Sequence, residues 1–227
     1  MKLYKFGFQI LFLGCLAPEA LAQQNNPLQI IPKPTSISPA KTHTHMPELD
    51  ALSIAKRANL MLNSINTMIA DFSQTNSLGQ GAEGKLYLLR PGRLKFEYSS
   101  PSTIEIVADG TSLAVRNKKL NTQDVYFIRQ TPLKFLLKQN INLAQDMKLV
   151  GVSSDAENTI LKMEDKSTFG GTSKIELFFR NSDFILSQWV IIDAQGSETK
   201  VRLSNIDLSK RPDRSLFTIN FDRFDNQ

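Results

Sequence analysis

The sequence predicts a mainly β fold with a few helices, built on one antiparallel sheet that curls over its apolar face. Three observations lead to this fold class. Residues 84–98 alternate between apolar and polar side chains on either side of an Arg-Pro-Gly corner, as two strands joined by a tight turn do. Asp109 and Gly110 mark a further hairpin turn. Helical spacing is confined to residues 48–65 and a short segment that begins at Pro132.

The first element of the domain is a helix over residues 48–65. Pro47 suits the first helical position, where a missing N–H has no partner to lose. Apolar side chains then recur at helical spacing and form a stripe of Leu49, Leu52, Ala55, Leu62 and Ile65. A helix with one apolar side must bury that side, so we expect it to cover the sheet.

The two strands that flank the Arg-Pro-Gly corner share one apolar side. Leu86 and Leu88 fall on this side of the first strand, and Leu94 and Phe96 repeat the pattern on the second. Arg90 has the same parity as the two leucines that precede it, so the pleat brings a permanent charge toward the apolar side. A charge in such a place needs a partner or a purpose.

The rest of the domain continues as an antiparallel meander. Strand patterns are found at Thr67–Thr75, Thr103–Ala108, Ser112–Arg116, Asp124–Ile128, Met147–Val152, Thr159–Met163, Ser173–Arg180, Ile185–Ile192, Glu198–Ile206 and Leu216–Phe221. A short apolar helix over Pro132–Gln139 interrupts them. Residues 48–227 therefore form one domain of roughly 180 residues, an ordinary size for a single domain.

Two helical segments are little cover for the apolar face of so large a sheet. A sheet of about ten strands must curl strongly, and its concave side is either underfilled or filled by large side chains. An underfilled apolar concavity is a ligand site. The alternative is that Phe96, Phe127, Phe179 and Trp189 plug the space. The sequence leaves both readings open.

Residues 1–22 have the pattern of a secretory signal. Lys2 and Lys5 precede a short apolar run, and Ala20 and Ala22 form a small-residue cleavage site, so we expect export and a mature chain that begins after Ala22. The only cysteine, Cys15, allows an alternative lipoprotein signal, because a small residue precedes it. We favour cleavage near Ala22 and location in the periplasm.

Residues 23–47 predict a disordered, proline-rich linker with little that can form a core. His43 and His45 form an H-x-H pair there, but a metal site needs a third or fourth ligand, and none is nearby. We therefore expect no metal and no other cofactor.

Composition argues against several classes of function. The formal net charge of +5 comes from scattered basic residues, which suits brief contact with anionic membrane surfaces and does not predict nucleic-acid binding. The mature chain has no cysteine, its two histidines lie in the linker, and no G-x-S-x-G, H-E-x-x-H or phosphate-binding glycine loop is present. A binding module fits better than an enzyme.

The order of short motifs along the domain resembles the LolA family of periplasmic lipoprotein carriers. The matching residues are Phe72-Ser73-Gln74, Gly81, Gly84, Leu86, Arg90-Pro91, Leu94, Phe96, Tyr98, Pro101, Asp109-Gly110 and the short helix over residues 131–137. The resemblance implies an incompletely closed antiparallel β-barrel with a helical lid. It also implies a monomeric carrier of acylated lipoproteins, which receives them from an inner-membrane ABC transporter and delivers them to an outer-membrane acceptor lipoprotein.

By the same resemblance, Arg90 is the latch between barrel and lid. The family position and the parity of the strands together give the expected acyl-chain cavity, lined by Leu62, Ile65, Leu86, Leu88, Leu94, Phe96, Leu133, Leu136 and Leu137. Each of these residues is equally compatible with plain core, and Arg90 with a surface ion pair. A membrane-anchored acceptor of the LolB kind and a lipid-binding sensor domain remain the alternative functions.

Overall fold

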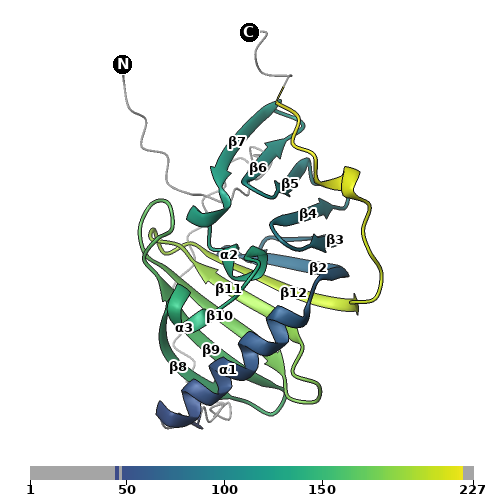
Figure 1. The fold of residues 1–227 in the computed structure, drawn as a ribbon. Helices are drawn as coiled ribbons and strands as arrows, with labels where there is room; N and C mark the ends of the chain where they lie inside the picture. The colour runs from purple at the N-terminus through teal and green to yellow at the C-terminus, as the bar shows by residue number, and fades with distance from the viewer. Residues whose placement is uncertain (1–43, 46–47, 222–227) are drawn as a thin grey trace, which may run out of the picture.

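The computed structural model describes residues 44–45 and 48–221, and it is built on one antiparallel sheet of twelve strands (Figure 1). The strands are β1 Thr44–His45, β2 Thr67–Asn76, β3 Gly81–Leu89, β4 Arg93–Tyr98, β5 Ile104–Asp109, β6 Ser112–Asn117, β7 Thr122–Phe127, β8 Lys148–Ser154, β9 Asn158–Asp165, β10 Ser173–Arg180, β11 Leu186–Ile192 and β12 Glu198–Asp207. The α-helices are α1 Glu48–Ser64, α2 Lys134–Leu137 and α3 Leu143–Asp146, and the 3-10 helices are η1 Ile128–Gln130 and η2 Arg214–Phe217.

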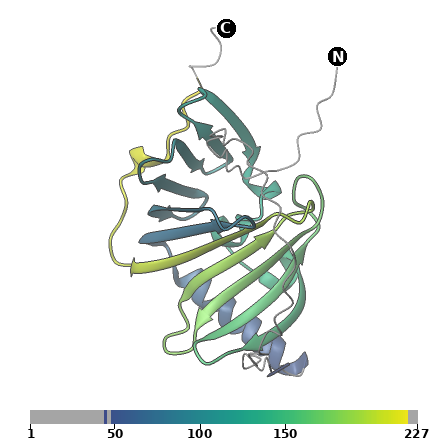
Figure 2. The same ribbon diagram turned by 180° about the vertical axis from the view of Figure 1, so that it is seen from behind.

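The sheet curls but does not close. Its strand order is β1-β8-β9-β10-β11-β12-β2-β3-β4-β5-β6-β7, so β12 pairs with β2 and joins the two halves of the meander. Within the described chain the end strands β1 and β7 each pair on one side alone. The view from behind shows the curled sheet in front of α1 (Figure 2). The predicted fold class, an incompletely closed antiparallel barrel covered by helices, is confirmed.

Helix α1 crosses the concave face of the sheet in front of the strands from β8 to β11 (Figure 1). Its buried stripe is Ala51, Ala55, Ala58 and Leu62, at the i, i+4, i+7, i+11 spacing of one helix face. The prediction placed Leu52 in this stripe, but Leu52 is 46% exposed, because it lies one position round the helix from Ala51. Three alanines let the helix approach the sheet closely.

The strands around the Arg-Pro-Gly corner pack as the alternation predicts. Leu86, Leu88 and Leu94 are completely buried, while the residues between them are less so. Gly84 pairs across the sheet with Tyr98, and a Cβ atom on Gly84 would lie 2.0 Å from the carbonyl oxygen of Glu97. Only glycine therefore allows β3 and β4 to approach at this point.

One predicted strand is wrong. Leu216–Phe221 was expected to be a strand, but the chain forms η2 and then an irregular segment. Asp213 caps η2 by accepting from the Ser215 N–H at 2.8 Å, and Ile219 packs on Val107 and Ala114 at the back of the sheet. The apolar side chains of this segment pack on the sheet, but its backbone does not pair with a strand, so alternation alone did not identify its structure.

The leading segments fall largely outside the described residues. The predicted signal over 1–22, Cys15, and residues 23–43 of the predicted linker lie there. Thr44 and His45, which the sequence assigned to the linker, pair with Ser154 and Ser153 as β1. Among the described residues, no helix has the length and hydropathy needed to cross a membrane, and no group of histidine, cysteine or acidic residues could hold a metal ion.

Candidate functional site

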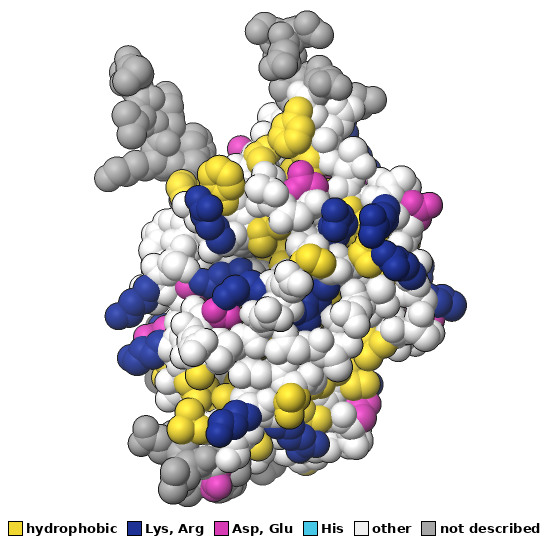
Figure 3. All heavy atoms as spheres, in the orientation of Figure 1, with side chains coloured by type: hydrophobic (Ala, Val, Ile, Leu, Met, Phe, Trp, Pro, Cys, Tyr) yellow, Lys and Arg dark blue, Asp and Glu magenta, His cyan; other side chains and the backbone are white. Residues whose placement is uncertain are grey.

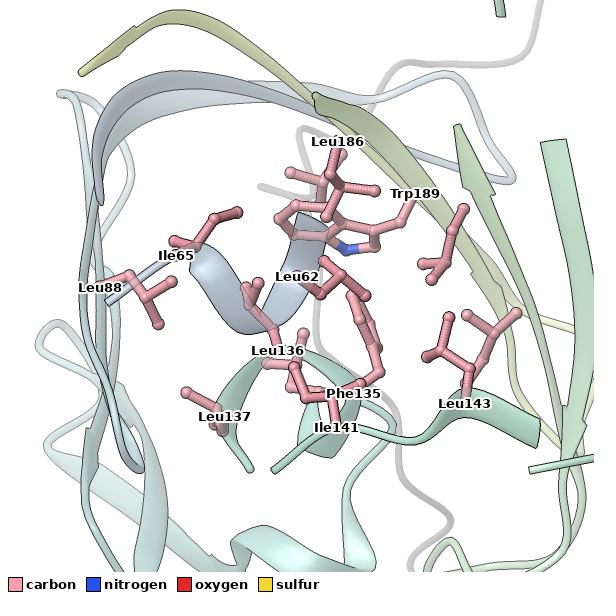
Figure 4. Packing of buried hydrophobic residues seen from close by; sticks show 14 of the residues in the cluster. Leu62, Ile65, Leu88, Phe135, Leu136, Leu137, Ile141, Leu143, Leu186 and Trp189 are labelled. Atoms are coloured by element: carbon pink, nitrogen blue, oxygen red, sulfur yellow. The ribbon is translucent and has the colours of Figure 1, made fainter. Parts of the chain in front are cut away.

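The candidate site is the apolar interior between the lid and the concave face of the sheet. We define the lid as α1 together with residues 131–146, which contain α2 and α3. In the close view the labelled side chains of α1, α2 and β11 point toward one another (Figure 4). All the residues predicted to line an acyl-chain cavity belong to one buried cluster: Leu62, Ile65, Leu86, Leu88, Leu94, Phe96, Leu133, Leu136 and Leu137. The structure thus brings every predicted lining residue together.

Aromatic side chains fill the centre of this cluster. The Trp189 ring lies 6.4 Å from that of Phe96 and 6.0 Å from that of Phe135, centroid to centroid, both in edge-to-face geometry. Trp189 is 1% exposed and Phe135 is fully buried. Phe179 is also buried, whereas Phe127, which the sequence offered as a plug, is 50% exposed. The interior around Trp189 is therefore filled by side chains.

Arg90 connects the sheet to both parts of the lid through its guanidinium. Nη1 donates to the carbonyl oxygens of Leu62 and, at 3.2 Å, Ile65, at the C-terminal end of α1. Nε donates to the Lys138 oxygen at 3.0 Å, and Nη2 donates to the oxygens of Lys138 and, at 2.8 Å, Gln139, just after α2. The last carbonyls of a helix lack internal partners, so five N–H donors in a rigid fork suit this position.

The corner that presents Arg90 is itself held against the lid. The Arg90 N–H donates to the Asn66 oxygen at 2.9 Å, and the Gly92 N–H donates to the Leu137 oxygen at 2.9 Å. Gly92 has φ +76, and a Cβ atom there would lie 2.6 Å from the Cα atom of Gly110. The sequence R-P-G therefore folds here because the glycine accepts both a left-handed φ and close contact with the neighbouring hairpin.

The charge of Arg90 is balanced by dipoles rather than by a carboxylate. Burial lowers the pKa of the Arg90 guanidinium from its ordinary value, yet arginine remains protonated in proteins. No ion pair of Arg90 occurs within the described part of the chain. The negative end of the α1 dipole points at it instead. The surface ion pair that the sequence left open is therefore absent from residues 48–221.

Asparagine side chains on α1 join the two parts of the lid, a role that the sequence analysis missed. Asn63 Nδ2 donates to the Ile141 oxygen at 2.8 Å, and Asn63 Oδ1 accepts from the Ile141 N–H at 2.8 Å. Asn59 Oδ1 accepts from the Leu143 N–H at 2.9 Å. Asparagines on the polar side of a helix give no signal of this in the sequence, since their partners lie about 80 residues away.

The start of α2 is fixed by a buried ion pair that the sequence analysis also missed. Lys134 Nζ lies 2.8 Å from each carboxylate oxygen of Asp165, at the end of β9, and also donates to Ser167 Oγ. Asp165 is 1% exposed and Lys134 is 8% exposed. Buried charges persist only with such partners. Helix α2 is thus tied to β9 at its start and to Arg90 at its end.

Comparisons with known proteins point to one family. The model of the family described as outer membrane lipoprotein carrier protein LolA matches residues 63–220. An outer-membrane lipoprotein carrier protein of Legionella pneumophila is 28% identical over 167 residues, which cover 70% of this chain and 81% of the relative. The protein of the same name from a Shewanella strain is 25% identical over 172 residues, which cover 72% of this chain and 80% of the relative.

Solved structures with a similar chain path include a LolA superfamily protein from Nitrosomonas europaea, with TM-score 0.44 and 13% identity, covering 74% of this chain and 97% of that one. The Mycobacterium tuberculosis lipoprotein LppX has TM-score 0.40 and 10% identity, covering 74% of this chain and 100% of that one. Because the family model spans every strand from β2 to β12 and contains the Arg90 corner, this chain belongs to the LolA family of outer-membrane lipoprotein carrier proteins.

Proposed function

We propose that this protein is a periplasmic carrier that binds the acyl chains of lipoproteins released from the inner membrane and delivers them to an outer-membrane acceptor. The observation that carries the proposal is the Arg90 contact, which joins the carbonyl ends of α1 and α2 to the sheet beside a large cluster of buried apolar side chains. Relatives named as carriers support it.

The cargo explains why the interior must open. Each methylene that leaves water contributes about 0.8 kcal/mol, so even a dozen methylenes represent about 10 kcal/mol. In the closed state the site residues Leu62, Leu88 and Leu136 are packed against other side chains, with 1% exposure or less. Acyl chains therefore enter only if the lid moves away from the concave face and exposes these same side chains.

The hydrogen bonds of Arg90 stabilise the closed lid and so raise the free energy of the opened, loaded state relative to it. Moving α1 and α2 away from the sheet breaks the hydrogen bonds from Arg90 to four carbonyl oxygens at the ends of these helices, and the guanidinium and the oxygens must then be solvated separately. The loaded form is raised in free energy relative to the empty closed form. Cargo is consequently held loosely enough to pass to an acceptor.

The remaining functional assignments rest on the family and the sequence. The proposed partners are an inner-membrane lipoprotein-releasing ABC transporter and an outer-membrane acceptor lipoprotein, and the carrier acts as a monomer in the periplasm after cleavage near Ala22. We propose a binding role without catalysis, because the interior is apolar apart from the Tyr98 hydroxyl and the Gln74 amide, and these two groups bond to each other.

The test is a release assay. Purified mature protein is incubated with spheroplasts or inner-membrane vesicles that carry an acylated lipoprotein and an active release system. We expect the lipoprotein to appear in a soluble one-to-one complex. Leu136→Glu places a carboxyl group in the interior and should abolish the complex, whereas Leu60→Glu, on a side chain of α1 that is 75% exposed, should not.

Two outcomes would replace the proposal. If mass spectrometry shows that the mature chain begins with an acylated Cys15, the protein is a membrane-anchored acceptor. If the chain begins near Gln23 and forms no complex while the release system is shown to be active with another carrier, the domain is a lipid-binding or sensor module without shuttle activity.

A further inference from the structure

Exposed aromatic and cationic side chains gather where β7 ends and the loop after β9 reaches it. Phe127 and Phe169 are each 50% exposed, and the Arg129 guanidinium lies 4.9 Å above the Phe127 ring. The Phe169 N–H donates to the Gln130 oxygen at 2.8 Å, which ties the loop to η1. Figure 3 shows hydrophobic side chains next to Lys and Arg side chains over this part of the surface. We call Phe127, Arg129, Lys166 and Phe169 the β7-end patch.

The patch carries a net positive charge. Both of its cations are exposed, and neither is in an ion pair with another described residue. Two acids beside the patch, Asp165 and Asp146, are each already paired with a lysine of the lid. A third, Asp124, shares its side of β7 with Tyr126, whose ring lies 6.0 Å from that of Phe169, and the two cations of the patch outnumber this one acid.

A groove connects the patch with the Arg90 corner. Its volume is about 460 Å³, and its lining includes Phe127 and Arg129 from the patch, Pro91 and Gly92 from the corner, and Leu137 and Lys138 from the end of α2. The patch is also continuous in sequence with the lid, since η1 leads directly into residues 131–137. Whatever the patch contacts therefore lies beside the part of the lid that Arg90 holds.

We propose that the β7-end patch docks the protein on the surface of a bilayer that contains anionic phospholipids. Phenyl rings insert at the level of the lipid headgroups, where their apolar surface is buried away from water. Arginine and lysine side chains pair with the lipid phosphates. Two rings and two cations give a weak, reversible contact, as a protein that leaves the membrane again requires. The proposal goes beyond lipoprotein carriage because it assigns a lipid surface to residues outside the apolar interior.

Vesicle sedimentation tests the proposal. The exported, purified protein is mixed with vesicles of phosphatidylcholine alone or of phosphatidylcholine with phosphatidylglycerol, and we expect partition onto the anionic vesicles that falls as salt is added. Arg129→Gln with Lys166→Gln should weaken partition by about fivefold per cation removed. Phe127→Ser with Phe169→Ser should weaken it on the same vesicles.

Matched controls use exposed residues at other turns. Lys119→Gln in the turn after β6 and Leu78→Ser in the turn after β2, whose side chain is 81% exposed, should leave partition unchanged. Equal partition onto neutral and anionic vesicles would overturn the proposal, and so would equal losses in the control variants. Patch variants that keep vesicle partition but slow lipoprotein transfer would also overturn it, by showing that a protein docks there. The carrier proposal stands or falls separately, on the soluble complex.

Discussion

Replacing Arg90 with leucine removes the side chain that holds both parts of the lid to the β3–β4 corner. Its guanidinium bonds four carbonyl oxygens, and a hydrogen bond to a charged group contributes about 1.5–3 kcal/mol. Much of this hydrogen-bond energy is recovered when the lid opens, because Arg90 is only partly buried and water can hydrate the carbonyls at helix ends. We expect the closed lid to lose about 2 kcal/mol relative to the open one, which is about thirtyfold in the equilibrium constant.

The expected phenotype is a protein that accepts lipoprotein but releases it poorly. With a less stable closed form, cargo is bound up to about thirtyfold more tightly, and transfer to an acceptor slows accordingly. Transfer from a preformed complex to acceptor-bearing vesicles measures this directly. Hydrogen exchange at the Gly92 N–H, which donates to the Leu137 oxygen, reports lid opening in the empty protein and should accelerate.

Two matched variants separate the latch from a loss of charge. Arg93→Leu removes a cation from the start of β4, three residues away, and should transfer normally. Arg90→Lys keeps the charge but not the planar fork, so it should fall between wild type and Arg90→Leu. Normal transfer and unchanged Gly92 exchange in Arg90→Leu would refute the latch role.

Three further perturbations test the closed structure. Burial raises the pKa of the Tyr98 hydroxyl above its ordinary value, so its stabilising contribution is complete below about pH 10 and is lost as pH rises through the higher folded pKa. In urea titrations at a series of pH values, Tyr98→Phe should lose less stability at alkaline pH than wild type. The same alkaline loss in both proteins would contradict the assignment of this loss to Tyr98. Gly84→Ala forces a methyl group against the Glu97 oxygen and should lower the free energy of unfolding by about 3 kcal/mol. The control is Gly79→Ala, whose methyl group would lie in open space, so its loss of stability should come only from the positive φ at this position. Lys134→Met leaves the buried Asp165 carboxylate without a countercharge, with the Ser167 N–H and hydroxyl as its remaining donors, and should cost about 3–5 kcal/mol. Lys134→Met combined with Asp165→Leu should restore most of this loss, and additive losses in the double variant would contradict the pairing.

Strand positions and their buried sides could be predicted because a pleat repeats every two residues. The burial of Leu86, Leu88 and Leu94 and the approach of Arg90 to the lid side all follow from parity counted from one corner. The same local rule failed at Leu216–Phe221, where alternation exists but no strand is free to pair with it. Helical spacing, a second local rule, placed Leu52 in the buried stripe of α1, whereas its side chain is 46% exposed.

Side-chain partners far apart in sequence could not be predicted. Asn63 and Ile141 are 78 residues apart, and Lys134 and Asp165 are 31 apart. Neither sequence separation matches a regular spacing from which a contact could be predicted. Whether Phe127 plugs the interior was equally undetermined, because only the tertiary structure decides which side of β7 faces the core, and Tyr126 lies on that side.

The sequence by itself determined the fold class, the order of motifs that places the chain in the LolA family, and the position of Arg90 on the lid side of the sheet. Periodicity and turn chemistry are local, so a single chain is enough to reveal them. Only the tertiary structure decided that the interior around Trp189 is packed in the closed state and that the four carbonyls bonded by Arg90 come from the ends of both lid parts. These depend on how segments from α1 to β12 meet in space, and packing at that range is fixed by the whole chain together.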